Sequence, residues 1–311
     1  MITIFTSDDA GAPVLSGQVG TLIPVLDACL INGYGAKVGM GWTKDFSGSN
    51  RAAYRAPAGN RFYLRVDDTN AQYPQFNGYQ AMSGISAGTG LFPSAVQLAG
   101  GIKGVKSSTA SSTARPWVII ASQQAFYLWV GFASATMGAL ATTTDIFFFG
   151  DCHSYMPGDA YLTAIVGRTA QDNGAVATNF GSKHGTGAVS VGHYMASDFA
   201  QSGNSEQFGT LVTPSVNSSD SGAGGGLYPD PITGGMVLDL IRIVEGGTIK
   251  RLIRGQLPGV YNPVHQWPGN HLDVLQGRGD LTGHDMVILY KGGNEGRLVF
   301  SLNESDWHPV A

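Results

Sequence analysis

Three stretches near the middle of this 311-residue chain, WVIIAS (117–122), AFYLWVGF (125–132) and DIFFFGD (145–151), decide its fold class. Each has the length of a strand and is rich in aromatic and β-branched residues, which favour β-structure. Their apolar residues run on without the polar alternation of a strand that has one face in water. We therefore expect several of these strands to be buried on both faces.

Strand patterns continue on both sides of this centre. In NRFYLRVDD (60–68), Phe62, Leu64 and Val66 alternate with polar residues, as in a half-buried strand. Near the C-terminus, KGGN (291–294) predicts a hairpin connection between two apolar runs. The sequence thus predicts a mainly β protein with β-sandwich-like antiparallel sheets and long Gly/Ser-rich loops.

A single amphipathic helix is expected near the N-terminus, over residues 20–32. Its apolar residues recur at helical spacing, Ser16 or Thr21 can cap its start, and Asn32-Gly33 supplies a left-handed stop. Because Asp27 is its only charge, we expect the helix to pack against a sheet.

The chain divides by pattern into a β-rich region 1–105, which contains this helix, and a β-rich region 106–311. The second region contains a loop-rich insertion, 170–235. One composite domain is the alternative. The segments 100–114 and 217–226 are rich in small and polar residues, so we expect both to be loops at subunit or partner contacts.

Composition favours a protein that is covered by neighbours. Charged residues make up 13% of the chain, about half the usual share, and there are 45 glycines. The net charge of −4 does not suggest a nucleic-acid partner. With no signal peptide, no apolar run long enough to cross a membrane and two cysteines, the sequence predicts folding in a cytoplasm and no membrane partner.

One stretch raises the question of catalysis. FFFGDCHSY (147–155) sets Asp151, Cys152 and His153 side by side, but successive strand residues point to opposite faces, so Cys152 and His153 would not form a dyad. We expect a strand end in which Asp151 caps the following turn. The alternative is a hydrolase that uses Asp151 and His153, and further acids such as Asp159 and Glu206 form no evident pair.

Other candidate groups have ordinary structural readings, and we expect no catalytic, cofactor-binding or metal-binding residues and no cofactor. The possible metal ligands lie in two groups: His265, His271 and His284 near Asp273 and Asp285, and Asp67, Asp68 and Asn70 after a strand. Three candidates remain. The basic cluster Lys250, Arg251 and Arg254 is expected on a solvated strand face, and the triplet in GRGDL (277–281) is expected in a turn. The loop aromatics Tyr73, Phe76 and Tyr79 could bind sugars.

A set of stretches, taken in order, resembles a known family. They are GTLIPVLDACLINGYGAK (20–37) followed by GW (41–42), NRFYLRVDD (60–68), ARPWVIIAS (114–122), FYLWV (126–130), FFFGDCHSYMPGDAY (147–161) and RGQLPGVYNPVH (254–265). Together they resemble virion structural proteins of tailed bacteriophages that infect Gram-negative hosts. The resemblance covers residues 1–165 and 236–311, and none of its motifs is a catalytic signature.

The resemblance implies a structural subunit of a virion rather than an enzyme. Its expected partners are other virion proteins and copies of itself, in a symmetric tail, baseplate or neck substructure. The alternatives are a decoration protein of the head surface and a module at the tail end that binds a host-surface glycan or receptor. A hydrolase is the alternative that the residues favour least.

Overall fold

The structure is a computed structural model, and it describes most of the chain. The described residues are 1–96, 98, 100–137, 144–157, 159, 161–167, 191–197, 204–212, 227–245, 252–265, 269–290 and 297–308. For 191–197, 204–212 and 245, only the backbone is described. The predicted loop 217–226, the turn 291–294, Lys250 and Arg251 lie outside these residues.

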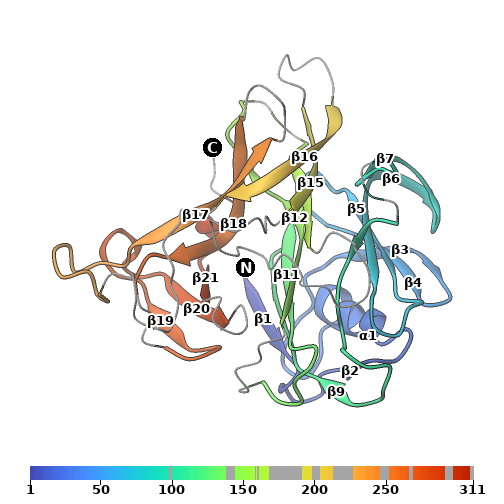
Figure 1. Cartoon of the computed structure of the whole chain (residues 1–311), viewed down its shortest axis with the longest axis horizontal. Coiled ribbons are helices and arrows are strands. Elements are labelled where there is room, and N and C mark those ends of the chain that lie inside the picture. Colours follow the sequence, from blue (N-terminus) through green and yellow to red (C-terminus); the bar gives the residue numbers. More distant parts are fainter. Residues whose placement is uncertain are drawn as a thin grey trace.

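The described strands form antiparallel sheets, and helices are few (Figure 1), so the mainly β prediction is confirmed. In spatial order, the large sheet contains β1 (Thr3–Thr6), β10 (Trp117–Ala121), β11 (Ala125–Val130), β12 (Asp145–Asp151), β14 (Thr163–Gly167), β15 (Val191–Ser197), β16 (Asn204–Val212), β17 (Leu238–Glu245), β18 (Ile253–Pro263), β21 (Arg297–Ser301), β20 (Asp285–Tyr290) and β19 (Val274–Gln276), and β13 (His153–Ser154) pairs with β18. The small sheet contains β3 (Thr43–Gly48), β4 (Arg51–Arg55), β5 (Tyr63–Asp67), β6 (Gln75–Gly84) and β7 (Ala87–Phe92), with β8 (Ile102–Lys103) beside β6. Separately, β2 (Leu15–Ser16) pairs with β9 (Ala114–Arg115).

Strands β10, β11 and β12 are buried along their whole length, as their apolar sequences predicted. Their side chains alternate between two hydrophobic cores. Phe147 and Phe149 belong to core 1, which also takes in the small sheet and the N-terminal helix. Phe148 points the other way into core 2, which also takes in β17, β18, β20 and β21. The centre of the large sheet is therefore a layer with apolar structure packed on both faces.

Stacked aromatic rings join the small sheet to this central layer. The rings of Phe76 in β6 and Phe147 in β12 are 4.0 Å apart and nearly parallel. Trp42, just before β3, meets Phe126 of β11 edge-on at 5.6 Å. Aromatic pairs of this kind contribute about 0.5–1.5 kcal/mol beyond the area that they bury.

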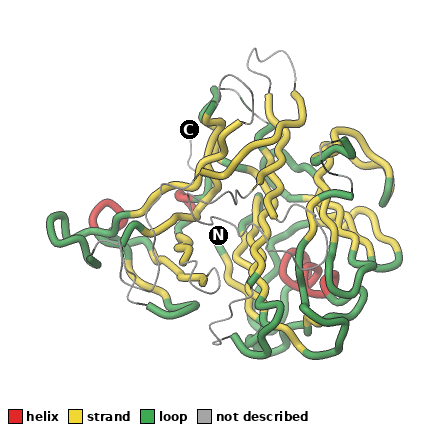
Figure 2. Tube along the Cα trace, viewed as in Figure 1, coloured by secondary structure: helices red, strands yellow, loops and turns green. Residues whose placement is uncertain are grey.

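The N-terminal helix differs in detail from the expectation over residues 20–32. An α-helix, α1 (Leu22–Leu26), continues directly into a π-helix, η1 (Asp27–Asn32), and both lie against the small sheet (Figure 2). Thr21 is the N-cap residue, but its side chain makes no capping hydrogen bond. The backbone N–H of Leu22 instead donates to the carboxylate of Asp68, 2.8 Å away. The helix start is thus capped by a residue of another element.

Two predictions about loops change. The expected contact loop 100–114 contains β8, and most of residues 101–107 are buried between the sheets rather than exposed to partners. The expected loop-rich insertion 170–235 contains β15 and β16, which continue the large sheet between β14 and β17. Core 1 includes side chains from both predicted regions, 1–105 and 106–311, such as Leu64 and Ile119.

Candidate functional site

The three residues that raised the question of catalysis have different surroundings in the structure. Asp151 is the last residue of β12, Cys152 packs against core 2, and His153 begins β13. The ring of His153 meets Tyr155 edge-on at 5.6 Å. Burial raises the pKa of the Cys152 thiol well above its usual value, so the sulfur is a thiol and not a thiolate nucleophile.

Asp151 ties three elements together. Its Oδ2 accepts a hydrogen bond from the backbone nitrogen of Asn60, 2.7 Å away, in the turn between β4 and β5. Its Oδ1 accepts from the hydroxyl of Thr163 in β14 at 2.6 Å, and the side-chain amide of Asn60 donates to the same hydroxyl at 2.9 Å. The expectation that Asp151 caps the turn following it is wrong, because its carboxylate holds a distant turn of the small sheet.

Gly59 makes this approach possible. Its φ of +69° lies in the left-handed region, and an added Cβ would lie 1.9 Å from Oδ2 of Asp151. Any other residue would therefore be strained and would also collide with the carboxylate. The turn and the strand end fit each other only with glycine at this position.

Burial raises the pKa of Asp151 to about 6, and the hydrogen bonds from Thr163 and Asn60 only partly offset that effect. Two donors directed at one buried carboxylate stabilise its ionised form. The side chain is 9% exposed and both oxygens are engaged by neighbours. The arrangement fits a structural tie whose charge depends on pH, and it leaves no free oxygen for a substrate.

A second buried polar cluster lies at the start of the helix. Lys106 forms an ion pair with Asp68, and their side chains are 1% and 0% exposed. The ammonium group also donates to the carbonyl of Gln18 at 2.7 Å. Burial raises the pKa of Asp68 and lowers that of Lys106, because each charge has lost its water, and the contact between them opposes both shifts.

The three residues considered as a calcium site are therefore directed to different partners. Asp67 pairs with Arg51 at 2.7 Å and Arg65 at 3.0 Å, whereas Asp68 faces Lys106. Asn70 accepts the backbone N–H groups of Gln72 and Tyr73, which makes an Asx turn.

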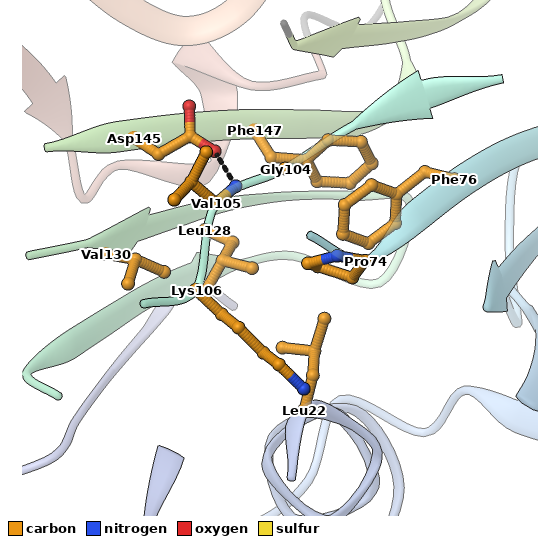
Figure 3. Close-up of a pocket in the computed structure, with 10 residues that line it drawn as sticks. All are labelled: Leu22, Pro74, Phe76, Gly104, Val105, Lys106, Leu128, Val130, Asp145 and Phe147. Atoms are coloured by element: carbon orange, nitrogen blue, oxygen red, sulfur yellow. Dashed lines mark hydrogen bonds between the residues drawn. The ribbon is translucent and has the colours of Figure 1, made fainter. Parts of the chain in front are cut away.

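A small cavity lies between the two sheets beside this cluster (Figure 3). Its walls are mostly apolar, with the stacked rings of Phe76 and Phe147 on one side. Asp145 lies at one end, where its carboxylate accepts the backbone N–H of Val105 at 2.6 Å, and the side chain of Lys106 extends towards Leu22 at the other. The cavity volume of about 10 Å³ corresponds to a single water molecule, so this space does not accommodate a substrate.

The C-terminal histidines also have separate partners. His265 is 2% exposed and its ring lies against Tyr228. The ring of His271 lies tilted against that of Trp129, with the ring centroids 4.4 Å apart, and it accepts the backbone N–H of Tyr290. Burial lowers the pKa of His271 to about 4. His284 pairs with Asp306 at 2.7 Å.

The carboxylates near these histidines have partners of their own. Asp273 accepts the backbone N–H of Asn270, and Asp285 accepts the side-chain amide of Gln276. No group of three potential metal ligands occurs in the part of the chain that the structure describes.

One pair of potential catalytic residues was missed in the sequence. The hydroxyl of Ser122, at the end of β10, is 3.0 Å from Nε2 of His308 near the C-terminus. Nothing in the local pattern could indicate it, because the two residues are 186 positions apart. Ser122 is 1% exposed, and its oxygen accepts the backbone N–H groups of Gln124 and Ala125. It closes a turn and cannot reach a substrate.

The candidate sugar-binding aromatics Phe76 and Tyr79 and one residue of the basic cluster, Arg254, are placed differently from the expectation. Phe76 and Tyr79 lie in β6 rather than in a loop, and Phe76 is 1% exposed. Arg254 is 4% exposed and faces Asp159, so the expectation of a solvated position is wrong for this residue.

Two further candidates remain. The GRGDL segment contains a 3₁₀ turn, η2 (Gly279–Leu281), between β19 and β20, as predicted. Glu206 lies in β16, and its side chain is outside the described residues.

Within the described residues, no helix combines the length and apolar character that crossing a membrane requires. Compared with known proteins, the chain matches no family model and no curated sequence.

Proposed function

We propose that this chain is a structural subunit of a tailed-bacteriophage virion, assembled through protein–protein contacts into a symmetric tail, baseplate or neck substructure. A decoration protein of the head surface is the alternative position within the same class. The proposal rests first on the resemblance of residues 1–165 and 236–311 to virion structural proteins.

The observation that carries the proposal is that ionisable side chains of the kind found in active sites have structural contacts here. Asp151, Asp68 and Lys106 each hold separate segments together from buried positions. The central strands are packed on both faces by apolar structure. Such an arrangement suits a rigid building unit, because its polar groups are engaged in tying layers together.

We also propose that the fold is a β-sandwich in which the small sheet and strands β10–β12 are the facing layers. The aromatic contacts between β6 and β12 support this description. A sandwich of this kind keeps its loops at the ends and edges, where contacts with other subunits form.

Purified particles test the proposal. Virions of the phage that carries this sequence should contain the chain in a fixed copy number by quantitative mass spectrometry, and a reconstruction should place it in the tail, baseplate, neck or head surface. Particles that lack the chain and are otherwise complete would overturn the proposal, as would turnover of a cell-wall substrate by the purified protein that is lost in His153→Ala.

Exposed aromatics favour one second candidate, a module that binds a host-surface glycan or receptor. Tyr155 and Tyr161, on the connection between β12 and β14, are 41% and 38% exposed. Tyr161 stacks on Phe62, which would hold its ring ready for a sugar face. Binding of the isolated protein to host cells or to a glycan array, lost in Tyr155→Ala/Tyr161→Ala, would favour this function; unchanged binding would exclude this site.

A further inference from the structure

Two surfaces of the molecule differ in charge. Residues 44–65, from β3 into β5, contain five of the chain's eighteen lysines and arginines and a single acid, Asp45. An even distribution over 311 residues would put only one or two cations in this segment. Arg55 faces Thr43 across β4 and β3, and Arg61 follows Asn60, which Asp151 of β12 holds, so both arginines lie where β4 turns into β5. We call this end of the small sheet the basic end.

Two cations of the basic end have no acidic partner among the described residues. Lys44 pairs with Asp27, and Arg51 and Arg65 pair with Asp67. By contrast, Arg55 lies over the ring of Tyr63 and donates from Nε to the carbonyl of Arg61. Arg61 is exposed. Arginine and tyrosine side chains are enriched in protein–protein interfaces.

One extreme of the long axis is acidic. It consists of the loop 227–237, the turn η2 and the adjoining ends of β19 and β20, and we call it the acidic tip (Figure 1). The pieces of this tip are in contact, since Arg278 lies over the ring of Tyr228 and Gly235 approaches Gly279.

The acidic tip carries more carboxylates than cations. Its carboxylates are Asp230, Asp273, Asp280 and Asp285, and none of them pairs with a cation among the described residues. Arg278 is the one cation of the described tip. Asp280 and Asp285 are exposed, so their charges face outward.

Apolar side chains lie exposed among these carboxylates. Ile232 is 92% exposed, Leu227 68% and Val274 49%. An apolar centre with a charged rim is the usual composition of a specific interface. In addition, β19 at the tip and β3 at the basic end are edge strands of their sheets among the described strands, so both ends offer unpaired backbone groups.

We propose that the acidic tip of one copy of this chain docks on the basic end of a second copy. This inference rests on the proposed function and names the contact through which the subunits assemble. Because the two surfaces are different and separate, the contact is heterologous and repeats from copy to copy, which produces a ring where the rotation closes and a filament where it does not.

Sedimentation velocity of the full chain tests the contact. We expect concentration-dependent self-association at about 50 mM salt that weakens at about 500 mM, where screening shortens the reach of the charges. Arg55→Glu/Arg61→Glu and Asp280→Lys/Asp285→Lys should each weaken association at least about tenfold. The combined four-residue variant should regain it, since its two ends are again of opposite charge.

Asp8→Lys, an exposed reversal outside both ends, is the matched control and should associate like the unchanged protein. A chain that is monomeric at low salt, an association that the reversals leave unchanged, or a failure of the four-residue variant to regain it would each overturn the contact. Melting curves of every variant exclude unfolding as the cause.

The failure of this contact is distinguishable from failure of the proposed function. A chain found in purified particles that shows no charge-dependent association would refute only the head-to-tail contact. A chain absent from particles that still associates in this way would refute only the virion role.

Discussion

The carboxylate of Asp151 and the backbone nitrogen of Asn60 are joined by a hydrogen bond of 2.7 Å, which connects the end of β12 to a turn of the small sheet. The two residues are 91 positions apart. This contact places a buried titratable group at the boundary between the two sheets, so the stability of the boundary should depend on pH.

Asp151→Asn should remove one component of that pH dependence. The folded pKa of Asp151 is about 6, above its ordinary value near 3.9, so the folded state holds the proton more tightly than the unfolded state. The stabilisation from protonation is complete below pH about 4 and is lost as the pH rises through about 6, a loss of about 3 kcal/mol. Urea unfolding of both proteins between pH about 4 and 8 measures the difference.

His271 and His308, whose pKa values burial lowers to about 4, contribute the opposite slope in both proteins, and this contribution cancels in the comparison. Asp8→Asn, which changes an exposed carboxylate, is the control and should keep the dependence of the unchanged protein. Parallel curves for Asp151→Asn and the unchanged protein would contradict the raised pKa.

Gly59→Ala should cost more stability than Gly234→Ala. Both glycines have a φ of +69°, so both substitutions carry the same backbone strain, about 1 kcal/mol. A Cβ at Gly59 would meet Asp151, whereas one at Gly234 would have nothing within 4 Å. We expect Gly59→Ala to lower the free energy of unfolding by a further amount of about 1–3 kcal/mol, because it disturbs buried hydrogen bonds. Equal melting temperatures for the two variants would show that the turn moves away freely.

Lys106→Met should destabilise the fold by about 3–5 kcal/mol, because it leaves the Asp68 charge buried without its cation. Adding Asp68→Asn should recover most of that loss, since the amide oxygen can still accept the N–H of Leu22. Lys44→Met, which breaks a partly exposed pair with Asp27, is the comparison and should cost less than about 1 kcal/mol. Chemical unfolding of the four proteins measures the free energy of unfolding of each.

Phe76→Leu and Phe147→Leu should be coupled, because the two rings stack at 4.0 Å. A double-mutant cycle should give a coupling energy of about 0.5–1.5 kcal/mol. The cycle of Phe76→Leu with Phe148→Leu should be additive within about 0.5 kcal/mol, since Phe148 belongs to core 2 on the other face of β12. A similar coupling in both cycles would contradict the separation of the two cores.

The local pattern was enough to predict the type of each central element. The unbroken apolar runs at 117–122, 125–132 and 145–151 predicted strands buried on both faces, because period-two alternation is lost only when neither face meets water. Similarly, the 3.6-residue spacing over 20–32 predicted a helix where the structure has α1 and η1, although the second half is a π-helix.

Tertiary structure alone decided what covers each face and where the polar groups are directed. Asp68 has the local context of a turn residue, yet it caps a helix and neutralises Lys106, 38 residues away. Phe147 and Phe148 are indistinguishable in sequence, yet they enter different cores. A local pattern records only whether a side chain avoids water, because burial depends on the residue itself. Its partner depends on which distant segment the chain brings to it, and the pattern carries no such information.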